Sequence, residues 1–547
     1  MTIINEGHSV AILRSALALD TSLPWAFRLV GFFAVSLAIS ACNGGSDIHT
    51  WKEGVFPEKD VFAANCAEPR SGSNPFDNNR PYPDQPGEIA DENFWLRSWT
   101  HDLYLWYSEV EDQDPNLFNT ADYFKELKTK QKTPSGSDKD NFHFSQDTFD
   151  YLNTTVAGIT FGYGYRLTVG NTSPPREFRI ADVVPGSPAD LAGIQRGMLI
   201  TSIDGADMIN GNTSAEIDTL YNGLSPPAVG ETHTFGMQSV GADTSVEFQI
   251  QSASIESVPV KDVSIIETAS GPVGYIHFNS HIRPSEGGLF DAFNQLRGVS
   301  DLVLDLRYNG GGLLAIAAQV SYMIAGEDNI DNQSFYALTF NDQHPTQDPV
   351  TGATLRPIPF YDATLGFDES LSARQSLPSL NLSRVYVLTS SGTCSASETI
   401  MNGLRGIGLE VIQIGDTTCG KPYGFYPQDN CGTTYFSVQF AGVNAVGFGE
   451  YADGFSPANT PGVTGTIIPG CWVADDFTHV LGDPEEALLA AALGHIEDQS
   501  CPALPPSVKN TAPAQNRNKS AEGQPASGAI TLPGNPGLEN LILDVKR

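Results

Sequence analysis

The spacing of hydrophobic residues changes character along this chain, and its first ordered pattern is helical. Residues 91–150 carry apolar side chains every three or four positions, the period of one helix face. The positions that set this period are Trp95, Trp99, Leu103, Trp106 and Val110, followed by Tyr123, Phe124 and Leu127. They predict two amphipathic helices in a small N-terminal helical region.

The pattern then changes to short strands with glycine turns in residues 151–255, and to apolar strands alternating with helices in residues 256–502. The strand Leu302–Leu306 has no continuous polar face, which is typical of strands buried on both sides of an α/β sheet. Other strands are expected at Val273–Phe278, Arg384–Leu388 and Val411–Ile414, and helices near 313–323 and 396–407. The predicted fold class is α/β, with a β-rich domain inserted in or preceding an α/β core.

The two ends of the chain lack this order. Residues 42–90 are rich in Pro, Asn and Asp and predict a tether, and residues 503–547 predict a disordered tail. Residues 29–41 are uncharged and follow Arg28 directly. This run is too short to span a bilayer but has the length of a signal-peptide core, so residues 1–41 are predicted to be a signal peptide.

The end of the apolar run resembles a bacterial lipobox. It reads Ile39-Ser40-Ala41-Cys42, and the resemblance implies cleavage before Cys42, acylation of its thiol and a membrane anchor. Asn43 stands where an Asp would retain such a lipoprotein at the inner membrane. The resemblance therefore implies a periplasm-facing outer-membrane lipoprotein of a Gram-negative bacterium. An ordinary secretory signal or a buried helix is the alternative.

Composition narrows the range of partners. The 547 residues include 30 Lys and Arg against 64 Asp and Glu, a net charge of −34. Such a charge repels phosphate backbones, and no basic run interrupts it, so we expect no nucleic-acid partner. An apolar content of 40% excludes a disordered chain.

Six cysteines remain besides Cys42, an even number in a chain predicted to enter an oxidising compartment. We therefore expect disulfides. The favoured pairs are close in sequence, Cys419 with Cys431 and Cys471 with Cys501, and Cys66 and Cys394 are left open.

No metal centre is expected. No cysteine pair has the spacing of a metal site. His277 and His281 stand four apart, but the residues between them lack the Glu of a zinc-protease helix. Both histidines are interpreted as structural.

A turn within the β-rich region has a distinctive sequence. Residues 185–193 read PGSPADLAG between two predicted strands, and they resemble the PDZ domains of bacterial proteases. In PDZ domains a peptide adds as a strand beside a helix, while loop N–H groups hold its C-terminal carboxylate. The resemblance places that helix after Thr213. It places the loop at Phe161, Gly162, Tyr163 and Gly164, for which a plain hairpin turn is the alternative.

Two strand-to-helix turns in the α/β core carry candidate chemistry. Residues 305–312 read DLRYNGGG, and residues 389–398 read TSSGTCSASE. Glycines let backbone N–H groups approach a ligand closely. A serine at the start of a helix lies where free amides and the helix dipole stabilise negative charge. The pair of turns predicts an acyl-transfer site.

With Gly420-Lys421 downstream, the two turns resemble those of the C-terminal-processing peptidases, or tail-specific proteases. The resemblance implies a crotonase/ClpP-like catalytic core with a PDZ domain and no cofactor. It implies Ser395 as nucleophile, Lys421 as general base, and the backbone N–H groups of Gly311 and Ala396 as oxyanion donors. A lysine, with a reference pKa of about 10.4, acts as a base near neutral pH only where burial lowers that pKa.

Each of these residues also has a simpler interpretation. Ser395 and Glu398 have the spacing of a helix capping box, and a glycine triplet is usually only a turn. A single lysine such as Lys421 is usually surface charge. Cys394 is a conceivable thiol nucleophile, although an oxidising compartment favours a disulfide. The joint occurrence of the motifs in family order favours catalysis.

One position departs from the family. Many members place a glutamine that orients the lysine four residues after it, whereas this chain has Phe425. Gln428, Gln439 and Glu398 are the candidates to replace that glutamine. The residue that orients Lys421 is left open.

The sequence thus predicts a serine endopeptidase that cleaves unstructured proteins and peptides in the periplasm and recognises their C-terminal ends through the PDZ domain. Whether an adaptor takes part is left open. One alternative is a catalytically silent PDZ and crotonase-like scaffold that binds peptides without cleaving them. Another is a hydrolase of non-peptide acyl groups.

Overall fold

The computed structural model describes residues 48–463, 465–505, 530 and 541–542. Residues 1–50 and 51–547 are separate units. The predicted signal peptide, the lipobox and Cys42 lie outside the described residues. Among the helices that are described, none is both long enough and apolar enough to cross a bilayer.

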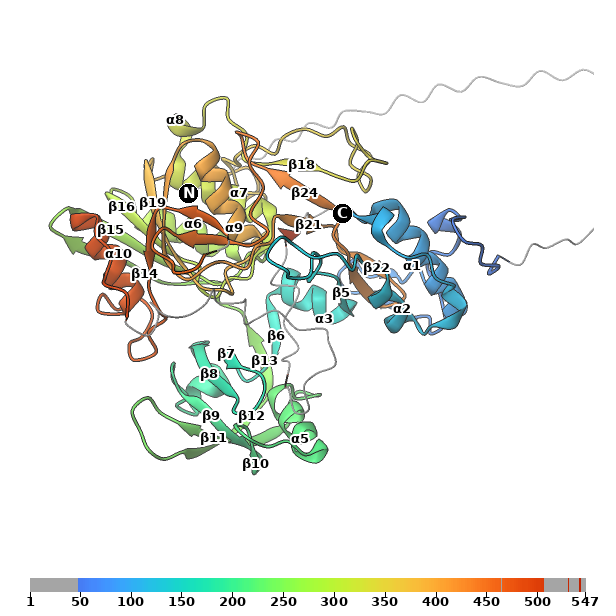
Figure 1. The fold of residues 1–547 in the computed structure, drawn as a ribbon, viewed down its shortest axis with the longest axis horizontal. Coiled ribbons are helices and arrows are strands. Elements are labelled where there is room, and N and C mark those ends of the chain that lie inside the picture. Colours follow the sequence, from blue (N-terminus) through green and yellow to red (C-terminus); the bar gives the residue numbers. More distant parts are fainter. Residues whose placement is uncertain (1–47, 464, 506–529, 531–540, 543–547) are drawn as a thin grey trace, which may run out of the picture. The chain divides into compact units, whose positions relative to one another are not determined.

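A six-stranded sheet forms the centre of the α/β core, with the strand order β14-β15-β16-β19-β20-β27 (Figure 1). The first pair is antiparallel and every other pair is parallel. The strands are β14 (Val260–Thr268), β15 (Gly271–Phe278), β16 (Asp301–Asp305), β19 (Arg384–Thr389), β20 (Glu410–Gly415) and β27 (Gly470–Trp472). The four strands expected in this core are confirmed.

Helices cover both faces of this sheet. Leu302 and Leu304 of β16 pack into a cluster with α6, α7 and α9, whereas Val303 between them packs with α10 on the other face. The helices are α6 (Ser285–Gln295), α7 (Leu314–Ala325), α9 (Ala396–Gly406) and α10 (Ala487–Asp498). Burial on both faces explains why the strand has no polar side, and it confirms the α/β prediction.

The β-rich region folds around its own sheet, ordered β12-β11-β9-β8-β7, with β10 paired to β9. Its elements are β7 (Tyr165–Asn171), β8 (Glu177–Val183), α4 (Pro188–Leu191), β9 (Leu199–Ile203), β10 (Ala206–Asp207), α5 (Ser214–Leu224), β11 (Thr232–Gln238) and β12 (Val246–Gln251). Thr213 caps α5 as expected, because its Oγ1 accepts the N–H of Glu216 while the Glu216 carboxylate accepts the N–H of Thr213. An antiparallel pair, β6 (Ile159–Gly162) with β13 (Ala253–Glu256), flanks the domain in sequence.

The N-terminal region contains the two expected helices, but the first is shorter than its hydrophobic pattern. Tyr104 adopts an extended backbone (φ −63°, ψ 132°), and its buried hydroxyl donates to Asp140 over 2.6 Å. The helix thus ends before Trp106 and Val110, which flank a 3₁₀ turn. The elements are α1 (Ile89–Leu103), η2 (Tyr107–Glu109) and α2 (Thr120–Glu126).

The segment expected to be a tether is folded from Trp51 onward. Phe62 is buried against Phe94 of α1, with ring centroids 5.4 Å apart. Cys66 forms a disulfide with Cys431. The expectation was wrong for residues 51–90 because partners distant in the sequence hold this segment in place. A local composition rich in Pro, Asn and Asp does not reveal such partners.

The disulfides correct one predicted pair and confirm another. They join Cys66 to Cys431, Cys394 to Cys419, and Cys471 to Cys501. The predicted bond between Cys419 and Cys431 is wrong, because the fold brings Cys419 beside Cys394 with 5.1 Å between their Cα atoms. Cys471–Cys501 is confirmed.

A second sheet, ordered β17-β28-β21-β24-β18, contains part of the tail that was expected to be disordered. Its strands are β17 (Gly312–Leu313), β28 (Leu541–Ile542), β21 (Tyr423–Phe425), β24 (Phe440–Val443) and β18 (Ala337–Thr339). Ile530 is also buried. The expectation of disorder is therefore wrong at these described positions.

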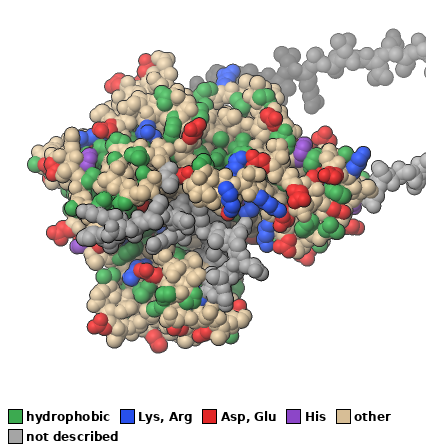
Figure 2. Space-filling model, in the orientation of Figure 1, with side chains coloured by type: hydrophobic (Ala, Val, Ile, Leu, Met, Phe, Trp, Pro, Cys, Tyr) green, Lys and Arg blue, Asp and Glu red, His purple; other side chains and the backbone are tan. Residues whose placement is uncertain are grey.

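Acidic side chains are scattered over the face of the molecule seen in Figure 2 and do not gather in one patch.

Candidate active site

Ser395 lies immediately before α9 in a conformation that non-glycine residues rarely adopt, with φ 59° and ψ −112°. The residue is fully buried. Its backbone N–H donates to Glu398 Oε2 over 2.9 Å, but its Oγ has no hydrogen-bond partner among the described residues. Glu398 therefore caps α9 through the backbone N–H of Ser395, and the Ser395 hydroxyl takes no part in this contact. The hydroxyl lies at the positive end of the helix dipole.

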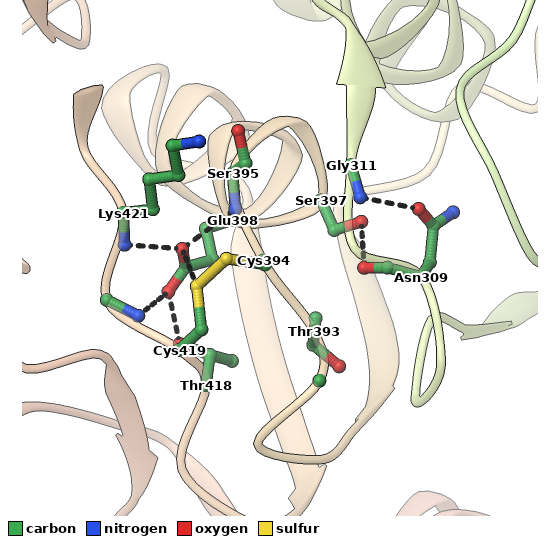
Figure 3. Close-up of a disulfide and its surroundings, with 12 residues drawn as sticks. Asn309, Gly311, Thr393, Cys394, Ser395, Ser397, Glu398, Thr418, Cys419 and Lys421 are labelled. Atoms are coloured by element: carbon green, nitrogen blue, oxygen red, sulfur yellow. Dashed lines mark hydrogen bonds between the residues drawn. A yellow bond between two sulfur atoms is a disulfide. The ribbon is translucent and has the colours of Figure 1, made fainter. Parts of the chain in front are cut away.

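The Glu398 carboxylate joins the serine turn to the lysine turn (Figure 3). Its Oε2 accepts the backbone N–H groups of Ser395 and Lys421, over 2.9 and 2.8 Å. Its Oε1 accepts the N–H of Gly420 over 2.8 Å and the hydroxyl of Thr418 over 2.5 Å. Burial raises the pKa of Glu398 above its ordinary value, while these four donors counteract that rise.

The disulfide between Cys394 and Cys419 ties the same two turns covalently (Figure 3). Cys394 directly precedes Ser395, and Cys419 stands two residues before Lys421. Cys394, Cys419 and Glu398 bring potential metal-ligand atoms together. Both sulfurs are engaged in the disulfide, so neither offers the thiolate that a nucleophile or a metal ligand requires.

Lys421 is fully buried between two aromatic rings. Its Nζ lies 4.6 Å from the ring centroid of Phe142 and 4.6 Å from that of Phe425, and its side chain extends toward Ser395 in Figure 3. Phe425, at the position of the family's glutamine, thus contacts the amine directly. Gln439 instead exchanges hydrogen bonds with the backbone of Tyr426. Sequence reasoning missed Phe142, because it lies in a region to which no chemistry was assigned.

The glycine turn lies directly against the serine turn. Gly311 has φ 109°, and a Cβ there would lie 2.9 Å from both Ser395 Cβ and Ala396 N. Only glycine allows this approach. The structure thus brings together the two predicted oxyanion donors, Gly311 and Ala396. In this conformation the N–H of Gly311 donates to Asn309 Oδ1 over 3.0 Å.

Asn309 and His281 hold the glycine turn in this conformation. The carbonyl of Asn309 accepts the Cys394 N–H over 3.1 Å and the Ser397 hydroxyl over 3.0 Å. His281 Nδ1 lies 3.0 Å from Asn309 Oδ1 and 3.2 Å from the Gly311 carbonyl. Burial lowers the pKa of His281 to about 3, so the ring is neutral and donates from Nδ1. Sequence reasoning missed Asn309, although its place in DLRYNGGG was the available signal.

The predicted carboxylate loop of the β-rich domain begins with the last two residues of β6. Phe161 is 49% exposed, whereas Tyr163 is buried and its hydroxyl donates to the Gly223 carbonyl in α5. Gly162 and Gly164 both have positive φ, and a Cβ on Gly164 would lie 2.2 Å from Ser187 Cβ. The loop therefore packs against the PGSP turn. Phe161 is exposed toward solvent, and Tyr163 belongs to the domain core.

Two arginines of the β-rich domain contact the glycine turn of the core. Arg166 donates to the Tyr308 carbonyl, and Arg196 donates to the Tyr308 hydroxyl over 2.6 Å. Arg196 also pairs with Asp475 over 2.7 Å. Tyr308 directly precedes Asn309, whose side chain accepts the Gly311 N–H. The two arginines therefore contact the neighbour of the residue that holds the Gly311 amide.

Two segments of the chain match known families. Residues 272–425 match Peptidase family S41, and this range contains Gly311, Ser395 and Lys421. Residues 179–218 match the PDZ domain. These matches bear out the resemblance inferred from the motifs.

Individual relatives agree with these matches. The chain is 28% identical over 282 residues to a carboxyl-terminal-processing protease of Picosynechococcus, covering 49% of this chain and 56% of that protein. It is 24% identical over 199 residues to a chloroplastic C-terminal processing peptidase of Tetradesmus obliquus, covering 33% and 40%. The chain thus spans about half the length of the curated relatives it matches.

A solved structure shares the fold. The crystal structure of a candidate S41 protease from Bacteroides fragilis covers 77% of this chain and 100% of its own, with 24% identity and a TM-score of 0.54. This likeness supports the α/β core combined with a β-rich domain.

Proposed function

Because residues 272–425 belong to the S41 peptidase family and residues 179–218 to a PDZ domain, we propose that this chain is a serine endopeptidase that cleaves unstructured polypeptides. In this proposal Ser395 is the nucleophile and Lys421 the general base. The carrying observation is Glu398, whose Oε2 accepts the backbone N–H groups of both residues and so holds their turns together.

The reaction follows serine-hydrolase chemistry with lysine in place of histidine. Neutral Lys421 takes the proton of Ser395 Oγ as that oxygen attacks the peptide carbonyl. Ala396 N–H and, once released from Asn309, Gly311 N–H stabilise the oxyanion. The C–N bond then breaks, the amine leaves with the proton, and water hydrolyses the acyl-enzyme and regenerates the hydroxyl.

The test is digestion of casein and of a quenched fluorescent peptide by Ser395→Ala, Lys421→Ala and the double variant. We expect each single change to abolish measurable turnover and the double change to cost hardly more, because the two groups act as a unit. Ser379→Ala, at a half-buried position, and Lys130→Ala, at an exposed one, are matched controls. Wild-type proteolysis by either active-site variant would refute the dyad, and binding without cleavage by the wild type would support the silent scaffold.

We also propose that the PDZ domain selects substrates by their C-terminal carboxylate. Amides of the loop at 161–164 would donate to that carboxylate, and exposed Phe161 would contact an apolar last residue. Losing such charge-assisted bonds typically costs about 1.5 to 3 kcal/mol, so amidating the peptide should weaken binding roughly tenfold to hundredfold. Equal affinity of free-acid and amidated peptides would contradict this selection.

Export and anchoring complete the proposal. The lipobox at 39–42 supports acylation of Cys42 and attachment to the outer membrane facing the periplasm. Labelling with a fatty acid should tag the wild type but not Cys42→Ala, which should also become soluble on fractionation. Equal labelling of both proteins would place the anchor elsewhere.

A further inference from the structure

The strand β28 lies between the two turns that carry the candidate chemistry. Leu541 pairs in parallel with Gly312 on one side and with Gly424 on the other, and Ile542 pairs with Leu313 and Phe425. β17 begins at the residue after Gly311, and β21 begins two residues after Lys421. The tail of the chain therefore occupies the gap between the glycine turn and the lysine turn.

This gap has the properties of a site for an extended peptide. In the described part of the chain, β17 and β21 pair with β28 and not with each other, so without β28 each would present an open strand edge. An open edge binds an extended chain through main-chain hydrogen bonds, which are largely independent of sequence. A polypeptide substrate reaching Ser395 would use these same edges.

A second point of the tail contacts the PDZ domain. Ile530 is fully buried in the hydrophobic cluster of that domain, which also contains Leu220 and Leu224 of α5. Its N–H donates over 3.0 Å to the carbonyl of Thr172, the residue after β7. Because β7 is the edge strand of its sheet, the tail meets the domain where an added strand would begin.

The amino-acid sequence of the tail agrees with these two contacts. Residues 506–528 are polar and rich in Pro, Asn and Ser, whereas Ile530 lies in the run AITL and Leu541–Ile542 in the run LILDV. The two apolar runs are separated by PGNPGLEN. The tail thus has high strand propensity at its contact with the core and apolar character at its contact with the PDZ domain.

The glycine turn is in a non-productive conformation while β28 is in place. The Gly311 N–H donates to Asn309 Oδ1, so it does not point at a carbonyl in the gap. A peptide bond held there would lack one of the two proposed oxyanion donors. The tail is accordingly bound in an arrangement that does not favour its cleavage.

From these observations we infer that the C-terminal tail is an intramolecular competitive inhibitor, which fills the substrate gap through residues 541–542 and is retained at the PDZ domain through Ile530. The inference rests on the proposed peptidase function. A polypeptide substrate enters only after the tail leaves the gap. A PDZ ligand that displaces Ile530 promotes this release.

The test uses the full chain with Leu541→Pro/Ile542→Pro, because proline lacks the N–H that a ladder requires. The control Leu541→Ile/Ile542→Val keeps the N–H groups and the strand propensity. A tail that occupies the gap nine-tenths of the time would weaken apparent peptide affinity about tenfold. In a peptidase assay we expect the proline variant to lower KM about tenfold with kcat unchanged, and the control to match the wild type.

A binding measurement separates this inference from the proposed function. In the Ser395→Ala background, fluorescence anisotropy with an unstructured labelled peptide should show about tenfold tighter binding for the proline variant. A synthetic peptide of residues 530–547 should compete for that binding. Equal affinity of the proline variant and its control would overturn the inference. A tenfold difference in binding without any proteolysis by the parent chain would uphold occupancy of the gap and refute only the peptidase function.

A second variant guards against misfolding of the first. Ile530→Asp places a charge in the apolar cluster of the PDZ domain and leaves residues 541–542 unchanged. We expect it also to tighten peptide binding, since the tail then loses its second attachment. Thermal unfolding verifies that each variant is folded. Unchanged affinity in folded Ile530→Asp would refute retention by the PDZ domain.

Discussion

The serine and lysine turns are held by a covalent bond, whereas the glycine turn opposite them is held only by hydrogen bonds. Cys394–Cys419 and the four donors on Glu398 fix the first pair of turns. The Gly311 amide instead donates to the Asn309 side chain, and its carbonyl accepts the backbone N–H of His281 over 3.0 Å and lies 3.2 Å from His281 Nδ1. Both arrangements are buried, but only the second consists of contacts that can exchange partners without breaking a covalent bond.

This difference assigns separate roles to the two sides of the site. The disulfide and Glu398 preserve the relative position of the Ser395 and Lys421 backbones, the candidate dyad of the proposed function. In the glycine turn, the Gly311 amide can rotate away from Asn309 without breaking a covalent bond. Tyr308, which precedes Asn309, contacts Arg166 and Arg196 of the PDZ domain. We therefore expect regulation by ligands to act on the glycine turn. We expect changes at Glu398 or at the disulfide to disturb the geometry of the candidate dyad.

Among the residues that position the candidate dyad, the largest effect is expected for Glu398→Gln. The amide replaces one acceptor oxygen by a donor that faces N–H groups, and each buried donor left unpaired costs about 1–3 kcal/mol. We expect kcat/KM to fall about a hundredfold, an effect equivalent to about 2.7 kcal/mol. Steady-state kinetics against exposed Glu485→Gln measures it. Activity within threefold of wild type would show that Glu398 does not position the dyad.

Glu398 also predicts a pH dependence. Burial raises its pKa, so acid protonates this carboxyl sooner than an ordinary glutamate. The protonated form accepts fewer of the four donors, and kcat/KM should fall on the acidic limb. A pH–rate profile should lose this limb in Glu398→Gln if the residue causes it.

Two disulfides provide a matched comparison of the serine and lysine turns with a part of the core that carries no candidate chemistry. Cys394–Cys419 and Cys471–Cys501 close loops of similar sequence separation, 25 and 30, so removing either should cost a similar stability of about 3.5 kcal/mol in the chain-entropy model. Only Cys394→Ser/Cys419→Ser should also lower kcat, by about tenfold or more, because a shift of the dyad by 1 Å is enough for such a loss. Chemical denaturation and kinetics of both double variants test this. Equal kcat losses in the two would assign the Cys394–Cys419 bond to stability alone.

His281 predicts a pH dependence of stability on the glycine side. Its folded pKa of about 3 lies below the ordinary value of 6.5, so the unfolded chain binds the proton first. The stabilisation is complete above about pH 6.5 and is lost as the pH falls toward 3, amounting to about 2 kcal/mol between pH 6.5 and 5. Denaturant unfolding at the two pH values should show that His281→Gln removes this difference, with His344→Gln as the control. An unchanged difference in His281→Gln would contradict the assignment.

The smallest effect is expected for Phe425→Gln. The change removes one of two rings on the Lys421 amine, a contact worth about 2 kcal/mol at a desolvated site, but it restores the family's residue, whose amide offsets this loss. Phe142 continues to contact the amine from the other side. We expect a change of threefold or less in kcat. A loss of a hundredfold would make Phe425 the principal positioning residue for Lys421.

Local patterns in the sequence determined most of the architecture and the identity of the candidate dyad. The middle of strands such as β16 is apolar because both faces are covered, and the period of three and four residues in α1 follows from the face that it buries. The capping box of α5 and the glycines of DLRYNGGG carry information within a few residues. Such features depend on backbone geometry and burial over short distances, so they can be recognised without the fold.

Contacts between distant residues were decided only by the tertiary structure. Cys66 pairs with Cys431 across 365 positions, and Phe142 reaches Lys421 from a region that the sequence linked to no chemistry. The tail strand at 541–542 joins β17 and β21 because their open edges meet there, which composition could not reveal. The partner of a cysteine, a ring or a strand edge depends on which surfaces the folded core brings together, and that information is spread over the whole chain.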